Sequence, residues 1–343
     1  MMRLCAVLLI CLSSSLMTAR AAPAAHWSVG FHRLTFLDPL DLQPMKALAF
    51  YPSFGREQSS KIGGYTIQAR EDSPIAIGRY PLLMLSHGNT GTPLALHDLA
   101  TSLARKGFIV VAVLHPGDNY KDNSRLGTLS NLYGRPMQIS AAITATLGDP
   151  MLSPFVEAEQ VGVIGYSAGG ETALILSGAQ PNLDRLRHYC QERPEDKDAC
   201  RTKGELIVDR DDLRPVADPR VHALMLMAPL SLMFGRHSLA DVHVPVLMYG
   251  GDGDKLVFPD KNVAALARKL PVAPQFRMIA GAGHFVFMAP CNEEQLKATP
   301  ALCTDPEGVN RVDIHRDLIF EAARFFSEVL SVPNRGGLQT ADQ

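Results

Sequence analysis

The sequence of 343 residues has little that would mark a disordered or nucleic-acid-binding protein. It contains one tryptophan and 7% aromatic residues, and neither sign of charge is in excess: 33 basic and 35 acidic residues leave a net charge of −2. This balance argues against a polybasic surface or an acidic tail, so we expect no nucleic-acid partner. Since 46% of the residues are hydrophobic, the chain can bury a core of ordinary size.

The hydrophobic stretch at the N-terminus, residues 4–12, is too short to span a bilayer comfortably. Arg3 precedes it, and Ala19 and Ala21 stand at the spacing of a signal-peptide cleavage site. We predict a signal peptide over residues 1–22, export to a periplasm or to the cell exterior, and no stable membrane anchor in the mature chain. The alternative is a buried N-terminal helix.

Cysteine is scarce, with six in the whole chain, and Cys5 and Cys11 would leave with the signal peptide. The other four form two close pairs in polar, loop-like sequence: Cys190 with Cys200, and Cys291 with Cys303. In an oxidising compartment this arrangement predicts two local disulfides, each worth about 3 kcal/mol by loop closure. Zinc is the alternative, but no C-x-x-C spacing and no suitably placed histidine favours it. We expect no cofactor.

From residue 80 onward, short hydrophobic runs alternate with helical patterns. The runs predict strands at 82–86, 108–114, 161–164, 221–227 and 244–249, of which the first two are expected to be buried, and a late strand at 275–279. The helical patterns predict helices at 95–106, 136–147, 258–270 and 313–330. Such alternation is typical of an α/β fold, in which helices cover both faces of a mostly parallel, doubly wound sheet.

The segment before this alternation has extended character. Hydrophobic stretches at 31–36 and 47–52, with turn signals at Gly63-Gly64 and Asp72-Ser73-Pro74, predict leading antiparallel strands. The sequence contains no repeat, low-complexity tract or linker that would divide it. We therefore predict one domain over residues 23–343.

Residues 181–220 interrupt the alternation of strands and helices. The segment is crowded with charged residues, carries the first cysteine pair, and is too long for an ordinary connection. We predict an inserted helical cap, held by the disulfide Cys190–Cys200 and lying above the strand ends. The alternative is a solvated surface excursion without a role.

The segment Gly165-Tyr166-Ser167-Ala168-Gly169 follows a predicted strand and begins a helical pattern of small residues. In this context a G-x-S-x-G sequence forms a tight turn, in which the serine backbone is strained and both flanking glycines avoid clashes. The turn exposes the hydroxyl to a histidine, so Ser167 is the predicted nucleophile. The motif alone is weak evidence, and its surroundings must support it.

His284 is the predicted general base. It stands in the small-residue segment Gly281-Ala282-Gly283-His284-Phe285, shortly after the last predicted strand. Of the eleven histidines, it alone lies in such a loop downstream of the serine. His315 falls in a helical pattern and is expected on the surface.

Two aspartates compete for the role of orienting this histidine. Asp252 and Asp254 both follow the predicted strand at 244–249. The Leu-Val-x-Pro sequence after them favours Asp254, whose carboxylate would hold the imidazole in the correct tautomer and stabilise the imidazolium. Asp252 suits the role of a helix cap.

With Ser167, Asp254 and His284 in this order and with these elements between them, the sequence resembles the α/β-hydrolase family from about residue 45 onward. Its first parallel strand is followed by Ser86-His87-Gly88-Asn89-Thr90-Gly91, which matches the family's His-Gly motif.

The resemblance implies an oxyanion hole. By that match, the backbone N–H groups of Asn89 and Ala168 would face the developing negative oxygen. His87 is expected to form structural hydrogen bonds rather than to act as a second base.

Within that family, the sequence also resembles dienelactone-hydrolase-like esterases and the platelet-activating-factor acetylhydrolases. The similarity rests on residues 80–88 and 106–113, on Arg135-Pro136 and on the cysteine-containing insert. Two features differ. Dienelactone hydrolases use a cysteine where this chain has Ser167, and the acetylhydrolases take their acid from a region corresponding to 221–230, which contains no carboxylate here.

The sequence therefore predicts an exported serine esterase that hydrolyses small or short-chain esters through an acyl-enzyme, with a small-molecule ester as its partner. Its pocket is expected to draw on the loop 117–134, Tyr166, the insert 181–220 and Phe285, whereas Met225, Met227 and Met248 are expected in the core. A peptidase or amidase with the same residues is one alternative, and a non-catalytic binding protein is another. The oligomeric state stays open.

Overall fold

The structure, a computed structural model, describes residues 27–330 and is built around one sheet. Nine strands lie in the order β11-β10-β9-β8-β6-β7-β2-β1-β5. The parallel part consists of β6 (Tyr80–Ser86), β7 (Ile109–Leu114), β8 (Val156–Tyr166), β9 (Val221–Met227), β10 (Val246–Gly251) and β11 (Gln275–Ile279). All six predicted strands are thus confirmed. The predicted signal peptide over 1–22 lies outside the described residues.

The leading antiparallel strands are also confirmed. β1 (Ser28–Leu37) pairs antiparallel with β2 (Pro44–Ser53), and β2 pairs antiparallel with β7. The short β5 (Arg70–Glu71) lies parallel to β1 at the edge of the sheet. β3 (Ser60–Ile62) and β4 (Tyr65–Ile67) form a separate hairpin, whose turn is the predicted Gly63-Gly64.

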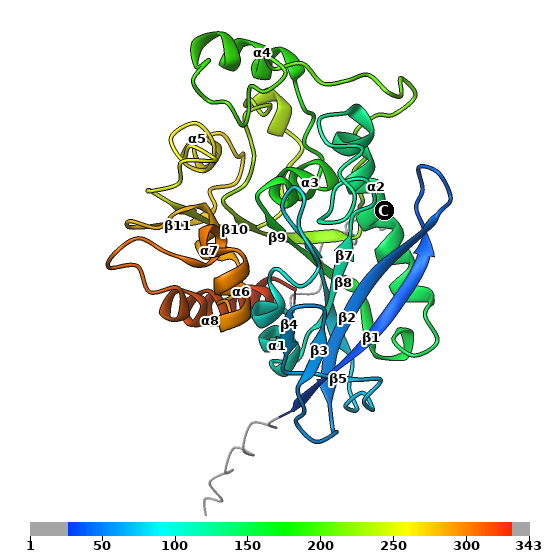
Figure 1. The fold of residues 1–343 in the computed structure, drawn as a ribbon. Coiled ribbons are helices and arrows are strands. Elements are labelled where there is room, and N and C mark those ends of the chain that lie inside the picture. The colour runs from blue at the N-terminus through cyan, green and yellow to red at the C-terminus, as the bar shows by residue number, and fades with distance from the viewer. Residues whose placement is uncertain (1–26, 331–343) are drawn as a thin grey trace, which may run out of the picture.

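Helices cover both faces of the sheet (Figure 1). On one face, α2 (Leu129–Gly148), α3 (Ala168–Leu176) and α5 (Val263–Ala267) pack on residues such as Met84 and Val163. On the other, α1 (His97–Arg105) and α8 (Arg311–Leu330) pack on Leu83 and Ile164. Successive strand residues point to opposite faces, and both faces are covered over β6, β7, β9 and β10, which explains why these strands are almost continuously hydrophobic. The edge strand β11 is largely exposed. The predicted core methionines 225, 227 and 248 are buried there.

Two predicted helix boundaries are wrong. α2 begins at Leu129 rather than at Pro136, because Thr128 Oγ1 accepts the Asn131 N–H and caps the helix there. Pro136 lies inside the helix, where it costs one backbone hydrogen bond. The helix predicted at 258–270 is only Val263–Ala267, since residues 258–262 form turns in which the Asn262 side chain binds the Phe258 carbonyl.

The insert 181–220 contains one α-helix, α4 (Leu183–Glu192), followed by turns and irregular chain. The predicted disulfide Cys190–Cys200 is present and fastens the end of the helix to these turns. The insert lies at the end of the molecule beyond α3 and α5 (Figure 1). Ile207 returns to the start of α2 by pairing with Thr128. Its action as a cap stays a prediction.

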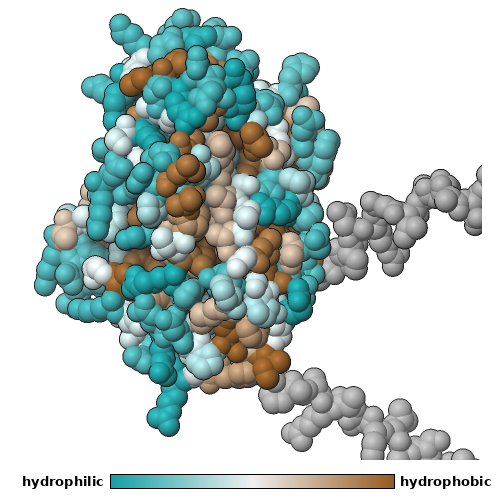
Figure 2. All heavy atoms as spheres, turned by 90° about the vertical axis from the view of Figure 1, so that its right-hand side faces the viewer, coloured by the Kyte–Doolittle hydropathy of each residue, from teal (hydrophilic) through white to brown (hydrophobic). Residues whose placement is uncertain are grey.

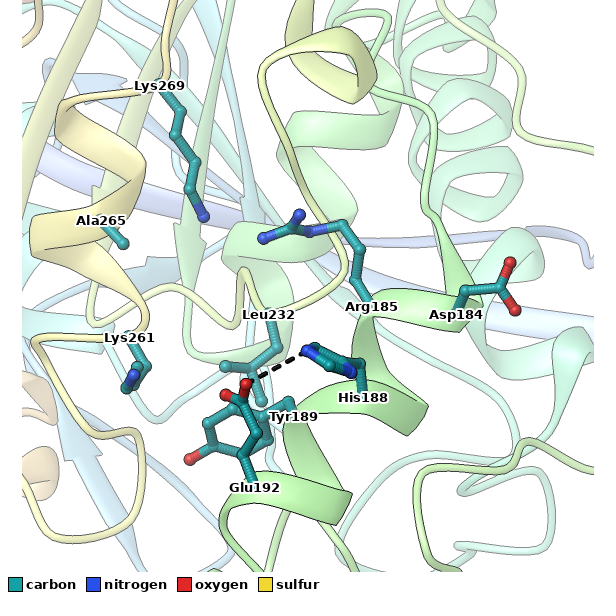
Figure 3. A pocket seen from close by; sticks show the side chains of 9 residues that line it. All are labelled: Asp184, Arg185, His188, Tyr189, Glu192, Leu232, Lys261, Ala265 and Lys269. Atoms are coloured by element: carbon teal, nitrogen blue, oxygen red, sulfur yellow. Dashed lines mark ion pairs between the residues drawn. The ribbon is translucent and has the colours of Figure 1, made fainter.

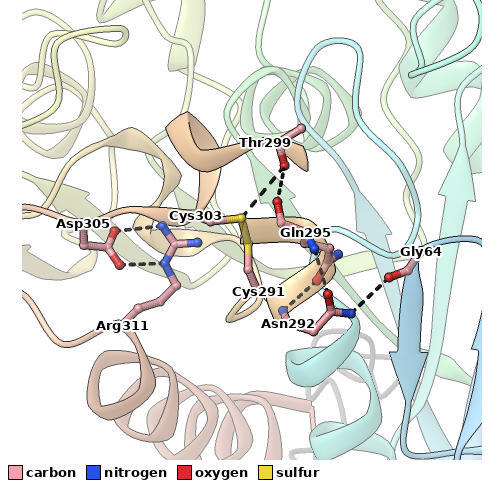
Figure 4. Close-up of a disulfide and its surroundings, with 8 residues drawn as sticks. All are labelled: Gly64, Cys291, Asn292, Gln295, Thr299, Cys303, Asp305 and Arg311. Carbon is pink, nitrogen blue, oxygen red and sulfur yellow. Dashed lines mark hydrogen bonds and ion pairs between the residues drawn. A yellow bond between two sulfur atoms is a disulfide. The ribbon is translucent and has the colours of Figure 1, made fainter. Parts of the chain in front are cut away.

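The second predicted disulfide, Cys291–Cys303, is present as well (Figure 4). It joins the start of α6 (Glu293–Ala298) to the end of α7 (Pro300–Cys303). Asn292 caps α6 and donates to the Gly64 carbonyl at 3.2 Å, which ties this disulfide-bonded segment to the β3–β4 hairpin. Two disulfides fit a protein of an oxidising compartment.

Hydrophobic residues gather on the side of the molecule that Figure 1 shows at the right, with β1 and α2 (Figure 2). A groove of about 500 Å³ lies between the end of β1 and α2, lined by residues such as Phe36, Leu37, Pro136, Met137 and Val216. Among the helices described, none combines the length and the hydrophobicity that crossing a bilayer requires.

Candidate active site

Ser167 lies in the sharp turn between β8 and α3, with φ 55° and ψ −118°. L-residues rarely adopt this conformation, and it persists only where the surroundings enforce it. A Cβ on Gly165 would lie 2.3 Å from the Gly169 carbonyl oxygen, and one on Gly169 would lie 1.9 Å from the Ser86 carbonyl oxygen. Both positions therefore require glycine, as predicted for a strained turn.

The turn brings the Ser167 hydroxyl to His284. The distance from Ser167 Oγ to His284 Nε2 is 3.0 Å, and His284 Nδ1 lies 2.7 Å from Asp254 Oδ2. The exposed fractions are 7% for Ser167, 8% for His284 and 4% for Asp254. Since a carboxylate only accepts, Nδ1 carries the imidazole proton and Nε2 accepts the serine hydroxyl. This arrangement can activate a hydroxyl as a nucleophile.

The two competing aspartates have different partners. Asp254 Oδ1 accepts the N–H groups of Leu256 and Val257 at 2.9 and 2.8 Å, which orients Oδ2 toward the imidazole. Asp252 is exposed and accepts the Gly281 N–H at 2.6 Å. The prediction of Asp252 as a helix cap is wrong: because residues 258–262 form turns, no helix starts there, and Asp252 holds the loop before the histidine.

Two buried side chains hold the loop on which His284 lies. The Tyr166 hydroxyl donates to the His284 carbonyl at 3.1 Å, and burial raises the pKa of Tyr166. His315 is 3% exposed, so its predicted surface position is wrong. Its Nε2 contacts the Val286 carbonyl at 2.8 Å and its Nδ1 contacts Asp98 at 2.5 Å. These bonds compensate its burial in the interface between α8 and α1.

The predicted oxyanion loop, residues 86–91, runs along the serine. A Cβ on Gly88 would lie 3.1 Å from Ser167 Cβ, so the backbone here passes directly against the nucleophile candidate. Neither the Asn89 N–H nor the Ala168 N–H donates a hydrogen bond to any of residues 27–330. Two such donors near a reactive hydroxyl can bind a negative oxygen.

His87 is fully buried behind this loop. Its Nδ1 lies 2.8 Å from the Gly88 carbonyl, and its Nε2 accepts the His115 N–H at 3.3 Å. Burial, together with the charge of Arg135, lowers the pKa of His87 to about 3. The ring is therefore neutral and forms structural hydrogen bonds, as the sequence predicts.

Comparison with solved structures finds a similar fold in an esterase. A ferulic acid esterase from Streptomyces cinnamoneus matches with a TM-score of 0.63 and 18% identity, over 92% of this chain and 96% of that chain. The chain has the α/β-hydrolase fold. In all, 898 solved chains resemble this one, and a fold so widespread does not define an activity. No protein family's sequence profile matches the chain. No curated protein matches it.

Within this hydrolase fold, Arg135 of α2 joins the predicted oxyanion loop to α3, the helix that follows Ser167. Its guanidinium donates to the His87 carbonyl, to Asp118 at 2.5 Å and to Thr172 of α3 at 3.1 Å. Asp118 in turn accepts the Thr90 N–H at 2.7 Å, where the backbone has φ 53°. Arg135 and Asp118 are 3% and 0% exposed, so neither charge exchanges these partners for water.

The sequence did not single out this network. In the sequence, Arg135 was noted only as part of the family resemblance, and Asp118 only as a residue of the predicted loop 117–134. An arginine in a helix of mostly small and hydrophobic residues was the one local signal. No three or more histidine, cysteine or acidic side chains within residues 27–330 are grouped so that they could hold a metal ion.

Glu171 lies one helical turn after Ser167 in the hydrolase fold. Its side chain is half-buried and forms no hydrogen bond with the described residues. Burial raises the pKa of Glu171 to about 8; the charge of Arg135 opposes this shift and the charge of Asp118 adds to it. A carboxyl whose pKa is raised on folding stabilises the protein fully below its unfolded pKa, and this contribution is lost as the pH rises toward 8.

Glu171→Gln should therefore remove a pH dependence of stability. At pH 4 we expect the wild-type protein and the variant to have the same free energy of unfolding, measured by urea denaturation. Between pH 4.5 and 8 the variant should become more stable by about 1–3 kcal/mol, since ionising the half-buried carboxyl costs the native protein free energy. Glu159→Gln, at an exposed glutamate, is the control and should show no such gap. A constant difference at every pH would contradict the raised pKa.

Proposed function

We propose that the protein is an exported serine esterase that hydrolyses small or short-chain carboxylic esters through an acyl-enzyme. The observation that carries this proposal is the continuous chain of hydrogen bonds from Ser167 through His284 to Asp254, at 3.0 and 2.7 Å, which begins in a strained turn. A strained serine with both partners buried is expensive to maintain, and nucleophilic catalysis explains its presence.

In the proposed reaction, Ser167 Oγ attacks the ester carbonyl while His284 Nε2 takes the hydroxyl proton. The tetrahedral intermediate collapses, the C–O bond to the alcohol breaks, and His284 returns the proton to the leaving alkoxide. A water molecule then attacks the acyl-enzyme by the same steps and releases the carboxylic acid. Asp254 keeps the imidazole oriented and stabilises the imidazolium formed in each attack.

The negative oxygen of each intermediate is proposed to lie between the N–H groups of Asn89 and Ala168. Neither donor has a hydrogen-bond partner within residues 27–330. Asn89 follows Gly88, whose backbone passes against Ser167, and Ala168 directly follows Ser167. Each donor of this kind contributes about 3 kcal/mol to the transition state. We propose no cofactor, because backbone donors supply the carbonyl activation.

Several features support the substrate class without defining one compound. The similar solved structure is named a ferulic acid esterase, and the sequence resembles dienelactone-hydrolase-like esterases. We propose that Phe285, Tyr166, the loop 117–134 and the insert 181–220 shape the pocket. The two disulfides support export. An amidase would use the same three residues, so only substrates can separate the two.

Two measurements test the proposal. A fluorophosphonate probe should label the wild-type protein at Ser167 and leave Ser167→Ala unlabelled. Nitrophenyl acetate, butyrate, octanoate and the matching anilides should then be compared by kcat/KM. We expect kcat/KM to be highest for the short esters and cleavage of the anilides to be negligible. No labelling would contradict the nucleophile, while faster anilide cleavage would indicate an amidase.

Arg135 provides a further prediction for this activity. Arg135 reaches Thr172, Asp118 and the His87 carbonyl with three different nitrogens of its planar fork, and the single ammonium nitrogen of a lysine cannot occupy all three positions. Arg135→Lys should therefore loosen the oxyanion loop and lower kcat by about 10- to 100-fold, with KM within about threefold. The measurement is steady-state hydrolysis of nitrophenyl acetate.

Arg220→Lys is the matched control. Arg220 pairs with Asp218 and donates to the Ser140 carbonyl of the same helix α2, away from the loop. This variant also replaces an arginine that bonds α2, and it should keep its kcat. Equal losses of kcat in both variants would assign Arg135 a purely structural role.

A further inference from the structure

A second site lies between the insert and the hydrolase core, away from the triad. A hollow of about 350 Å³ opens between α4 and α5, at the lower end of the volumes typical of small-molecule sites (Figure 3). Ser167, His284 and Asp254 are not among the residues that line it. Binding in this hollow would not require the proposed esterase activity.

Three cations line this hollow. Arg185 comes from α4, Lys269 from the turn after α5, and Lys261 from the turns before it. Figure 3 shows the head groups of Arg185 and Lys269 directed toward each other across the hollow. Like charges on neighbouring elements repel one another. An anion bound between them would offset this repulsion.

None of these cations forms an ion pair with a carboxylate of the described chain. Arg185 and Lys261 form no ion pair and no side-chain hydrogen bond with residues 27–330, and Lys269 donates only to the neutral Phe234 carbonyl at 3.1 Å. Most other arginines that the structure describes are paired with aspartate or glutamate. Burial, followed by the charges of Arg185, Arg268 and Lys261, lowers the pKa of Lys269.

Two acidic residues, Asp184 and Glu192, also line the hollow, and each has another partner. Glu192 pairs with His188 at 3.1 Å, and Asp184 pairs with Arg187. Asp184 also points away from the cations in Figure 3. The lining therefore holds three cationic side chains against two carboxylates, and neither carboxylate pairs with any of the three cations.

We propose that this hollow binds a small phosphate-bearing anion, either free phosphate or a phosphomonoester. Three donors from separate directions suit a tetrahedral oxyanion with several oxygens better than a planar carboxylate. The volume exceeds that of phosphate alone and leaves room for a short organic group. Because the cations come from both the insert and the core, binding would fasten one to the other.

Calorimetric titration of the mature protein with inorganic phosphate and with glycerol 3-phosphate tests this site. The ionic strength must be held constant with sodium chloride, since screening alone alters such binding. We expect saturable binding. Equal affinities would identify free phosphate as the ligand, and tighter binding of glycerol 3-phosphate would identify a phosphomonoester.

Two matched variants test the location. Arg185→Gln removes a cation that lines the hollow, whereas Arg268→Gln removes an exposed, neighbouring cation that does not line it. Arg185→Gln should weaken binding by about tenfold or more, and Arg268→Gln by less than about threefold. Circular dichroism checks that both variants fold. Absence of saturable binding in the wild type, or equal weakening in the two variants, would overturn the proposal.

Discussion

Ser167→Ala should lower the turnover of nitrophenyl acetate by about a thousandfold or more. Removing Oγ removes the atom that would form the acyl-enzyme, and no other hydroxyl of the described chain contacts His284 Nε2. Only water attack assisted by the oxyanion donors would then remain. The measurement is kcat on purified protein with a matched far-ultraviolet circular dichroism spectrum.

Ser177→Ala is the control for this variant. Ser177 ends the same helix, and its hydroxyl donates only to the Leu174 carbonyl at 2.9 Å. Its loss should leave kcat within about twofold. Retained hydrolysis in a folded Ser167→Ala protein would refute the acyl-enzyme, and with it the proposed function.

Asp254→Asn should lower kcat by about 10³- to 10⁴-fold, which is the second large effect. An amide can present its N–H₂ group to His284 Nδ1, and the proton would then move to Nε2, which faces Ser167. In that tautomer the imidazole cannot accept the serine proton. Asparagine has nearly the size of aspartate and can still accept the N–H groups of Leu256 and Val257. The fold should therefore persist.

Asp252→Asn distinguishes this explanation from a general effect of charge in the loop. The residue lies two positions away and touches the Gly281 N–H, not the imidazole. Its asparagine variant should lose less than about tenfold in kcat, because the amide oxygen can accept the same bond. A larger loss in Asp252→Asn than in Asp254→Asn would reverse the proposed assignment of the acid.

Most of the parallel strands were predictable because they are hydrophobic on both faces, so the signal lies within a few consecutive residues. The edge strand β11 is the exception, since it is largely exposed. Helix boundaries were harder. Pro136 suits a first helical turn, yet Leu129 and Leu132 bury themselves in the core and Thr128 caps the helix ahead of them. Packing of that early turn outweighs the hydrogen bond that proline removes.

In the candidate site, too, the local features were predictable and the long-range contacts were not. The strained turn at Ser167 and the small-residue loop before His284 are local patterns, so both were visible in the sequence. The burial of His315 was not, because its partner Asp98 lies 217 positions away. Arg135 likewise meets the His87 carbonyl, Asp118 and Thr172, each from a different element.

The sequence by itself determined the alternation of strands and helices, the serine turn with its two obligatory glycines, and the two disulfide pairs, since short-range sterics and spacing govern all three. Tertiary structure alone decided which aspartate meets the imidazole, what holds the oxyanion loop, and where cations of α4 and of the turns flanking α5 come together. These depend on distances between elements that are remote in the sequence. Such distances are set only when the helices pack against the two faces of the sheet.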